Sequence, residues 1–197
     1  MKVLLALLIV SCLLFTGSYA LDNNDSWFPI QISVIDPIAL PPVNNVYGLK
    51  LNLLHGFGNN VMGFNYGVIG SSINKMSGLQ WGFVFNSANE LKGIQTAFII
   101  GYADTVKPFS LQLSAINIAS NNGGFQLGIV NIAQNKTSNE LGFCLQWGCW
   151  NSTAKLRGLQ LGLINIVSDD FEGWQIGFYN ISPNWFFPFI SYSPFKS

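Results

Sequence analysis

Charged residues are scarce in this sequence. Nine Lys and Arg and nine Asp and Glu among 197 residues give a charged fraction of 9% and a formal net charge of zero, against ~25% in average soluble proteins. The balanced charge excludes the basic surface by which proteins bind nucleic acid. So low a charge also indicates that one face is covered by a membrane, by another copy of the chain or by a partner. The sequence does not say which of these three it is.

Residues suited to catalysis or metal binding are also few. His55 is the only histidine, so no histidine-based metal cluster can form, and we expect it to take a hydrogen-bonding position that Asn fills in other copies of the repeat described below. No nucleophile has both a base and an orienting partner. The carboxylates of Asp169, Asp170 and Glu172 are interpreted as a solvated turn rather than a cation site. The sequence predicts a protein that is not an enzyme and needs no cofactor.

Residues 1–20 have the features of a signal peptide. Lys2 supplies the positive charge, Val3 begins the apolar stretch, and Ser18 and Ala20 are the small residues of a cleavage site. The apolar stretch is shorter than the ~20 residues of a membrane span. A lipoprotein signal acylated at Cys12 is the alternative that stays open. The sequence therefore predicts an exported protein of the cell envelope, in the periplasm, in the outer membrane or at the cell surface.

The exported part lacks a disulfide framework. Its two cysteines, Cys144 and Cys149, are five residues apart in a strand-like segment, which places their side chains on opposite faces. They cannot form a disulfide with each other without breaking that strand. An exported fold without disulfides must be held by packing and by backbone hydrogen bonds.

An internal repeat runs through almost all of the exported part. Its unit is Gly-φ-Gln-φ-Gly-φ-φ-Asn, where φ is apolar or aromatic. Successive copies are 15, 15, 15, 17, 14, 20, 14 and 15 residues apart, so nine units recur with a period close to 15. The first two units depart from the pattern, since Lys50 and Asn65 replace the Gln. The nine units begin at Gly48, Gly63, Gly78, Gly93, Ser110, Gly124, Cys144, Gly158 and Gly173.

Within a unit, apolar and polar residues alternate with the period of two that is typical of a β-strand. Each unit predicts one long or bent strand of about ten residues and a tight turn. The recurrent amides can form ladders between stacked units, because each has a donor and an acceptor. The fifth residue is almost always small, which implies a bend or a close backbone approach. These structural positions are Gln80, Gln95, Gln112, Gln126, Gln146, Gln160, Gln175, Gly82, Gly128, Gly148, Gly162, Gly177, Asn117, Asn131, Asn151, Asn165 and Asn180.

Two all-β architectures fit this repeat. In a β-solenoid, each unit forms one coil and the coils stack in parallel, so that nine of them make a rod ~43 Å long at ~4.8 Å each. In an antiparallel meander or an outer-membrane β-barrel, the units are consecutive strands of suitable length. A barrel should repeat as a hairpin of two unlike strands, yet Gln and Asn recur in every unit. The sequence therefore favours the solenoid.

The two ends differ from the repeats, because they are aromatic and marked by proline. Repeat stacks need atypical terminal segments that hide their open edges. We therefore divide the chain into a signal peptide (1–20), an N-terminal cap strand with a Pro-rich turn (21–47), a nine-unit repeat domain (48–182) and an aromatic C-terminal cap (183–197).

Four features together resemble a known family: the opening at 29–34, the segment at 46–56, the repeat unit, and the Phe-Pro-Phe tail at 187–189. They resemble the surface repeat-containing proteins of spirochaetes and other Gram-negative bacteria. The resemblance implies a signal peptide and an envelope location, and it supplies no activity, substrate or catalytic residue. The function expected is a non-enzymatic structural or interaction role in the cell envelope, with a narrow or structural outer-membrane barrel as the alternative.

Overall fold

The computed structural model describes residues 27–35, 38–135, 143–183 and 185–195. The predicted signal peptide and Cys12 lie outside these residues. Within the described residues, no helix is long and apolar enough to cross a membrane. The strands are β1 (Trp27–Ile35), β2 (Ile38–Leu40), β3 (Asn45–Gly67), β4 (Gly70–Gly82), β5 (Phe85–Ala97), β6 (Ile100–Val106), β7 (Leu111–Leu113), β8 (Ile116–Asn122), β9 (Phe125–Leu127), β10 (Val130–Ala133), β11 (Cys144–Trp147), β12 (Trp150–Leu161), β13 (Ile164–Ser182) and β14 (Trp185–Ser193).

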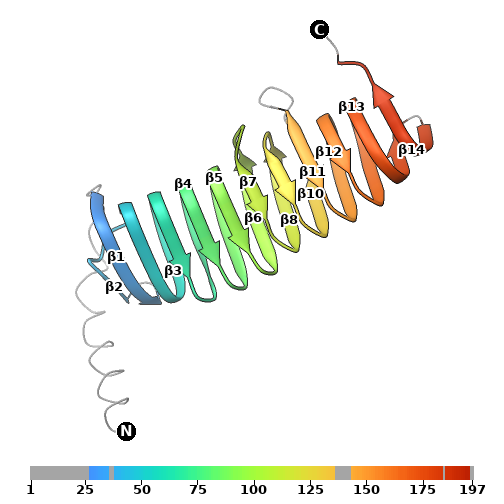
Figure 1. The fold of residues 1–197 in the computed structure, drawn as a ribbon. Helices are drawn as coiled ribbons and strands as arrows, with labels where there is room; N and C mark the ends of the chain where they lie inside the picture. Colours follow the sequence, from blue (N-terminus) through green and yellow to red (C-terminus); the bar gives the residue numbers. More distant parts are fainter. Residues whose placement is uncertain (1–26, 36–37, 136–142, 184, 196–197) are drawn as a thin grey trace, which may run out of the picture.

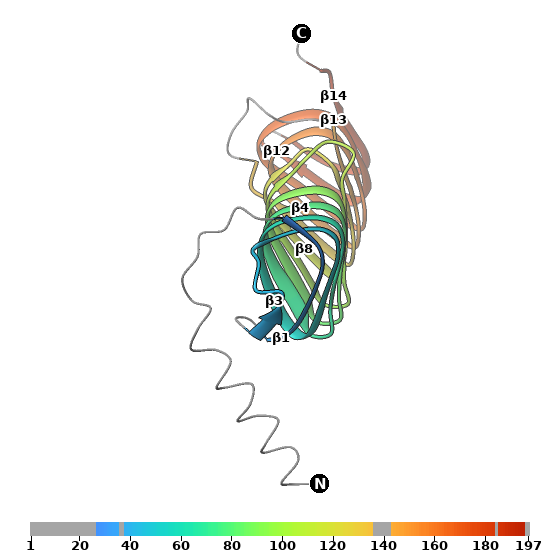
Figure 2. The same cartoon turned by 90° about the vertical axis from the view of Figure 1, so that its left-hand side faces the viewer.

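Successive repeat units pair in parallel and in register. Each residue faces its counterpart in the next unit, as in the pairing of Gln80 with Gln95 across β4 and β5 and of Asn151 with Asn165 across β12 and β13. The coils stack along one axis (Figure 1), and they lie one behind another when viewed from the N-terminal end (Figure 2). The predicted β-solenoid of about nine coils is confirmed. The alternative of an antiparallel meander or an outer-membrane β-barrel is wrong, because neighbouring units run in the same direction.

Each coil has three sides, which β5 and the residues around it illustrate. The second side is formed by 85–88, the third by 90–92 and the first by 94–97. The chain bends sharply between the first and second sides, at Phe98 and Ile99. Parallel pairing is interrupted between the second and third sides, at Asn89. Between the third and first sides Gly93 has a φ of 127°, a conformation that favours glycine.

The prediction of one strand of about ten residues per unit is wrong in its boundaries. The motif from the first Gly to the Asn straddles the sharp bend, so it contains the end of one strand and the start of the next. In the regular N-terminal coils, strands such as β4 and β5 instead run from one sharp bend to the next over 13 residues. The alternation of buried and exposed residues shifts phase at the corner around Asn89, where Ala88 and Leu91 are both buried. Across the sharp bend it keeps its phase in these coils, since Gly82 and Asn86 are both buried, so sequence periodicity does not mark that bend.

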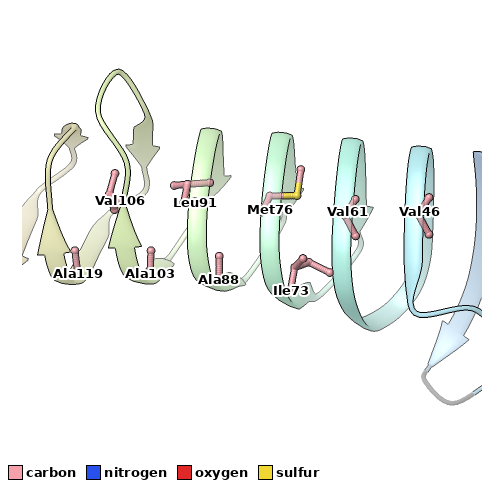
Figure 3. Packing of buried hydrophobic residues seen from close by; sticks show 9 residues of the cluster. All are labelled: Val46, Val61, Ile73, Met76, Ala88, Leu91, Ala103, Val106 and Ala119. Carbon is pink, nitrogen blue, oxygen red and sulfur yellow. The ribbon is translucent and has the colours of Figure 1, made fainter. Parts of the chain in front are cut away.

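The apolar part of the interior lies near the third side. One row of buried side chains contains Val61, Met76 and Leu91, and a second contains Ile73 and Ala88 (Figure 3). These rows belong to one cluster that reaches from Val46 to Ala119. A separate, smaller cluster lies in the later coils and comprises Cys144, Leu156, Val167 and Phe171.

Antiparallel strands cover both open edges of the parallel stack. At the N-terminal end, β1 pairs in parallel with β3, and β2 pairs antiparallel with β1. At the C-terminal end, β14 pairs antiparallel with β13. Unpaired strand edges favour association with other chains, so these terminal strands leave a stack in which internal coils are hydrogen-bonded on both sides.

Candidate functional site: an apolar corner with a groove

The repeated glutamines form one continuous row inside the solenoid. From Gln95 onward, each Nε2 donates to the Oε1 of the glutamine in the preceding coil, over 2.7–3.0 Å. The same Nε2 also donates across the coil to a backbone carbonyl, as Gln160 does to Ile166. All members are 0% exposed, so their role is structural. They are Gln80, Gln95, Gln112, Gln126, Gln146, Gln160 and Gln175.

The repeated asparagines form a second buried row that donates in the opposite direction. Each Nδ2 donates to the Oδ1 of the asparagine in the following coil, over 2.8–2.9 Å. The amide dipoles of the two rows therefore oppose each other, and within the two rows only the end atoms Asn117 Oδ1 and Gln175 Oε1 are buried without a hydrogen-bond partner. The row comprises Asn117, Asn131, Asn151, Asn165 and Asn180.

The small fifth residues lie where adjacent coils approach each other. A Cβ added to Gly162 would overlap the backbone oxygen of Gly148 and lie 2.6 Å from Asn151 Nδ2. The same overlap with the preceding coil occurs at Gly128, Gly148 and Gly177. At Gly82 the nearest atom is instead Asn86 Oδ1, at 2.6 Å. At Gly128, Gly148, Gly162 and Gly177, glycine is thus required by the close approach of the preceding coil and its amide row.

The first two units fill the amide rows with other residues. The buried Lys50 takes the glutamine position and donates to Gln31 Oε1 in β1. Asn65 accepts from Asn52 and donates to Ser71. His55 does not take the asparagine position, contrary to expectation. Its ring stacks on Phe85 at 5.1 Å, because the residue in register with Ser71 and Asn86 is Gly56.

Large apolar side chains point outward around the sharp bend. They occupy the fourth, sixth and seventh positions of the units, whose third and fifth positions point inward. We call this surface the apolar corner, and it extends over all nine units. Its most exposed members, each at least 40% exposed, are Leu53, Leu54, Val68, Ile69, Phe83, Phe98, Ile99, Leu113, Ile129, Trp147, Trp150, Leu163, Ile176, Phe178 and Tyr179.

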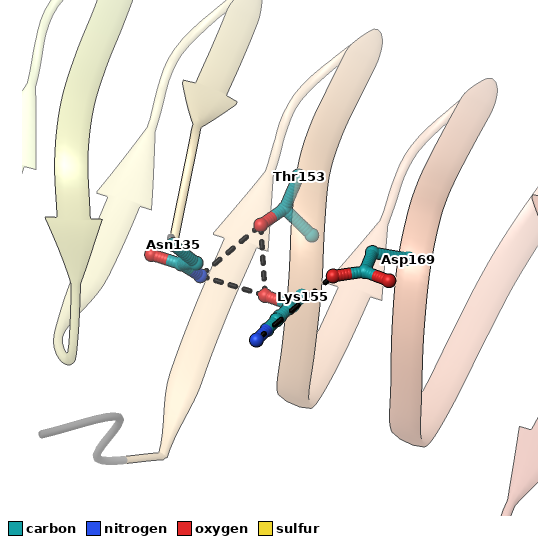
Figure 4. A network of polar contacts seen from close by, with 4 residues as sticks. All are labelled: Asn135, Thr153, Lys155 and Asp169. Carbon is teal, nitrogen blue, oxygen red and sulfur yellow. Dashed lines mark hydrogen bonds and ion pairs between the residues drawn. The ribbon is translucent and has the colours of Figure 1, made fainter. Parts of the chain in front are cut away.

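Charged side chains lie on the third side of the coil or at the edge of that side, away from the apolar corner. Some pair between adjacent coils, with Lys155 3.9 Å from Asp169 (Figure 4) and Arg157 3.8 Å from Glu172. Apart from the buried Lys50, this side holds every charged residue of the described ranges. These residues are Lys75, Glu90, Lys92, Asp104, Lys107, Lys155, Arg157, Asp169, Asp170 and Glu172.

A groove of about 870 Å³ runs along the first side of the solenoid, beside the sharp bend. One wall is the fourth-position row, including Trp81 and Trp147, and the other is the sixth-position row, including Phe83 and Ile129. The floor is formed by the fifth-position residues of the units from 78 to 158. No charged residue lines the groove.

The polar atoms of the groove floor are already hydrogen-bonded within the solenoid. The backbone N–H groups of Gly128, Gly148 and Gly162 each donate to a carbonyl of the next coil over 3.0 Å. The hydroxyl of Ser114 accepts from the N–H of Ala97 at 3.2 Å. The floor therefore offers no free backbone donor to which an extended peptide could add a strand.

The cysteines and one tyrosine have distinct environments. Cys149 is exposed and lines the groove, whereas Cys144 is buried, and burial raises the pKa of the Cys144 thiol to about 12. The hydrogen bond from Tyr102 to Asp104 raises the pKa of that phenol. Within the described ranges, no group of three or more His, Cys, Asp or Glu could hold a metal ion.

The sequence interpretation did not identify the groove. It recognised which residues share a face but not which face points inward. A usable signal exists in the repeats themselves, because the inward positions are nearly uniform (Gln, Gly, Asn), whereas the outward positions vary among aliphatic and aromatic residues. Stacked ladders need identical residues, and an outer surface does not.

Comparison with protein-family models found no match, and searches of curated proteins and of solved structures found no significant similarity. The class of the protein therefore follows from its geometry. It is a β-solenoid repeat protein with a polar ladder interior and an apolar outer corner. This fold fits a structural or interaction repeat protein.

Proposed function

We propose that this β-solenoid is a non-enzymatic structural or interaction protein of the cell envelope, and that the apolar corner is its contact surface. The observation that carries the proposal is the separation of the two surfaces. The apolar corner continues over nine units, while the exposed charges gather on the third side. Contiguous apolar surface of this extent on a soluble protein marks an interaction site.

The regular rigid coil supports an interaction role over catalysis. The Gln and Asn side chains that recur in the repeat lie inside the fold, where they form hydrogen bonds with one another. The titratable side chains of the described residues lie mostly on the third side, away from the groove, where ion pairs such as Lys155 with Asp169 join neighbouring coils. Exposed pairs of this kind contribute little to stability, and they keep one side of the rod hydrated.

The envelope location rests on the sequence. Residues 1–20 have the pattern of a signal peptide, and the chain resembles the surface repeat-containing proteins of spirochaetes and other Gram-negative bacteria. A protein exposed to bulk water on all sides would also be expected to carry more charge than 9%. An apolar corner that contacts an envelope component accounts for both the export signal and the low charge.

Cell fractionation with paired variants tests this proposal. The corner variant Phe98→Glu/Ile129→Glu places two charges where side chains are 72% and 59% exposed, so it should fold but lose its envelope contact. The control variant Ser77→Glu/Gln134→Glu adds the same charge outside the apolar corner. We expect the wild type and the control in the envelope fraction, released by urea or alkaline washing, and the corner variant in the soluble fraction.

Two results would contradict the proposal. One is a wild-type chain that stays in the cytosol. The other is a corner variant that remains in the envelope as firmly as the control. Circular dichroism and thermal unfolding of both variants establish that each is folded before its distribution is compared.

A further inference from the structure

We propose that the groove beside the sharp bend binds one long hydrocarbon chain of a lipid. This inference rests on the proposed function and deepens it, because the groove forms part of the apolar corner.

The chemistry of the groove excludes most polar ligands. Its lining carries no charge, and its walls are aromatic and aliphatic side chains such as Trp81, Phe98 and Leu113, apart from Thr96 in one wall and Cys149 in the other. The floor N–H groups and the Ser114 hydroxyl are engaged within the fold. A sugar or peptide would bury polar groups without partners there, which is unfavourable. An alkyl chain has no such groups to satisfy.

The shape of the groove suits a linear ligand. Because the coils stack in register, the groove continues across the strands from Gly82 to Gly162. These residues are five coils apart, or ~24 Å at ~4.8 Å a coil. One leaflet of a bilayer has a hydrocarbon thickness of ~15 Å, half of the ~30 Å core, so the groove is long enough for a complete acyl chain. Its volume of about 870 Å³ lies in the range of small-molecule pockets, ~300–1,000 Å³.

Ala115 lies midway along the sixth-position wall. Its methyl group stands in the row where Phe83 and Phe98 place aromatic rings, which themselves stack at 5.7 Å. A larger side chain at this position would fill the middle of the groove from the outside and leave the buried amide rows untouched. The site can therefore be blocked without altering the interior.

Fluorescence quenching by a brominated fatty acid tests the proposal, because bromine quenches tryptophan on contact and Trp81 and Trp147 line the groove. The purified protein is titrated with 9,10-dibromostearate below the concentration at which the probe aggregates. We expect saturable quenching with one chain bound per protein. Brominated octanoate, which fills only part of the groove, should bind at least tenfold more weakly.

Matched variants locate the site. Ala115→Phe should weaken dibromostearate binding at least tenfold, whereas Ala154→Phe, the same substitution beside the charged third side, should bind as the wild type does. Ile129→Lys provides a second test should Ala115→Phe unfold, since Ile129 is 59% exposed and outside the core. It places a charge in the wall and should also abolish binding.

Each other outcome overturns the proposal. Quenching that does not saturate, or that is as strong in Ala115→Phe and Ile129→Lys as in the wild type, removes the groove as the site. Quenching seen only with vesicles of brominated phosphatidylcholine assigns the corner to a bilayer surface. A stable dimer that excludes the probe assigns the groove to a second copy. In these cases fractionation with the envelope can still hold, so failure of this inference is distinct from failure of the proposed function.

Discussion

The coils before and after residue 110 hold their interiors in different ways. In the earlier coils, apolar side chains form most of one cluster, which begins at Val46 and extends into the next coil at Ala119, and the positions equivalent to the asparagine row are Gly56, Ser71, Asn86 and Gly101. In the later coils the apolar cluster formed by the described residues is small and separate, while the asparagine row is continuous. The coils are thus stacked in register in both regions, but the core is divided.

The length of the sharp bend accounts for this division. Three residues separate the fifth residue from the asparagine position in the earlier coils, as between Gly82 and Asn86. Two do so in the later coils, as between Gly148 and Asn151. In the shorter bend, Asn151 Nδ2 lies 3.4 Å from the carbonyl oxygen of Gly148 in its own coil. The shorter bend therefore allows each asparagine to close its own corner and bond to the next coil.

A polar segment separates the two apolar clusters. Asn122 lies opposite Val106 in the apolar row, and its Nδ2 contacts the sulfur of Cys144 at 3.1 Å. Asn135 accepts from the N–H of Asn122 and donates to Thr153 and to the carbonyl of Lys155 (Figure 4). These bonds compensate for coils of irregular length. The difference teaches that the coils stay stacked across both regions with the glutamine row unbroken from Gln80 to Gln175, whereas the apolar core is interrupted.

The largest effect is expected from filling the space at the fifth position. Gly162→Val and Gly128→Val should cost about 4 kcal/mol or more, because the Cβ would overlap the backbone of the preceding coil. Gly82→Val in the earlier coils should cost ~1–3 kcal/mol, as overpacking does, since its nearest obstacle is the Asn86 side chain. Thermal and urea unfolding measure both. Equal unfolding of Gly162→Val and the wild type would contradict the close packing of coils.

A second comparison truncates the apolar core in each region. Leu91→Ala should cost ~4 kcal/mol and Leu156→Ala ~2 kcal/mol, within the usual range for such truncations. Leu91 has the apolar Met76 and Val106 in register on the two neighbouring coils, whereas among the described residues Leu156 has one apolar partner in register, Phe171. Urea unfolding at constant m-value gives both numbers. A larger loss at Leu156 would reverse the assignment of the main core to the earlier coils.

Substitutions in the asparagine row should show the opposite order, with the larger loss of stability in the later coils. Asn151→Ala removes bonds with both Asn131 and Asn165 and leaves buried partners unsatisfied, so we expect a loss of ~3 kcal/mol. Asn86→Ala breaks its bonds with Ser71 and with the carbonyl of Thr96 and should cost ~1.5 kcal/mol. The two substitutions remove the same atoms, so their difference measures the row. Equal losses would mean that continuity of the row adds nothing.

The sequence alone predicted the fold but not the surface. Recurrence of Gln, a small residue and Asn at corresponding positions of successive units predicted parallel stacking, because only stacked coils bring like residues together. The sequence could not place the inside of the coil, since alternation assigns Leu161 and Gln160 to opposite faces without ranking them. Burial of amides in preference to leucine is favourable only when each amide bonds two neighbours, as Gln160 does with Gln146 and Gln175. The groove forms because the amide face points inward and the apolar face points outward, so the sequence did not predict the groove either.

The smallest effect on stability is expected from modifying the cysteines. Their reactivity reports on the junction between the two regions, which is the polar segment at Asn122 and Asn135, without changing stability. Thiolate is the reactive form, and the raised pKa of the buried Cys144, about 12, leaves about one thiol in ten thousand ionised at pH 8. A maleimide reagent should therefore modify the exposed Cys149 in the folded protein and Cys144 only after unfolding. The pKa of Cys144 is higher folded than unfolded, where it is ~8.5, so this thiol favours unfolding only as the pH rises above ~8.5.

The variant Asn122→Ala sharpens this test. Removing the side chain that contacts the Cys144 sulfur should open the junction locally and speed modification of Cys144 at least tenfold, with Cys149 unchanged. Leu91→Ala, several coils away, should alter neither rate under conditions where it is folded. A Cys144 rate that responds equally to both substitutions would show that the two regions open as a single cooperative unit, in which case the polar segment at Asn122 and Asn135 does not divide the core energetically.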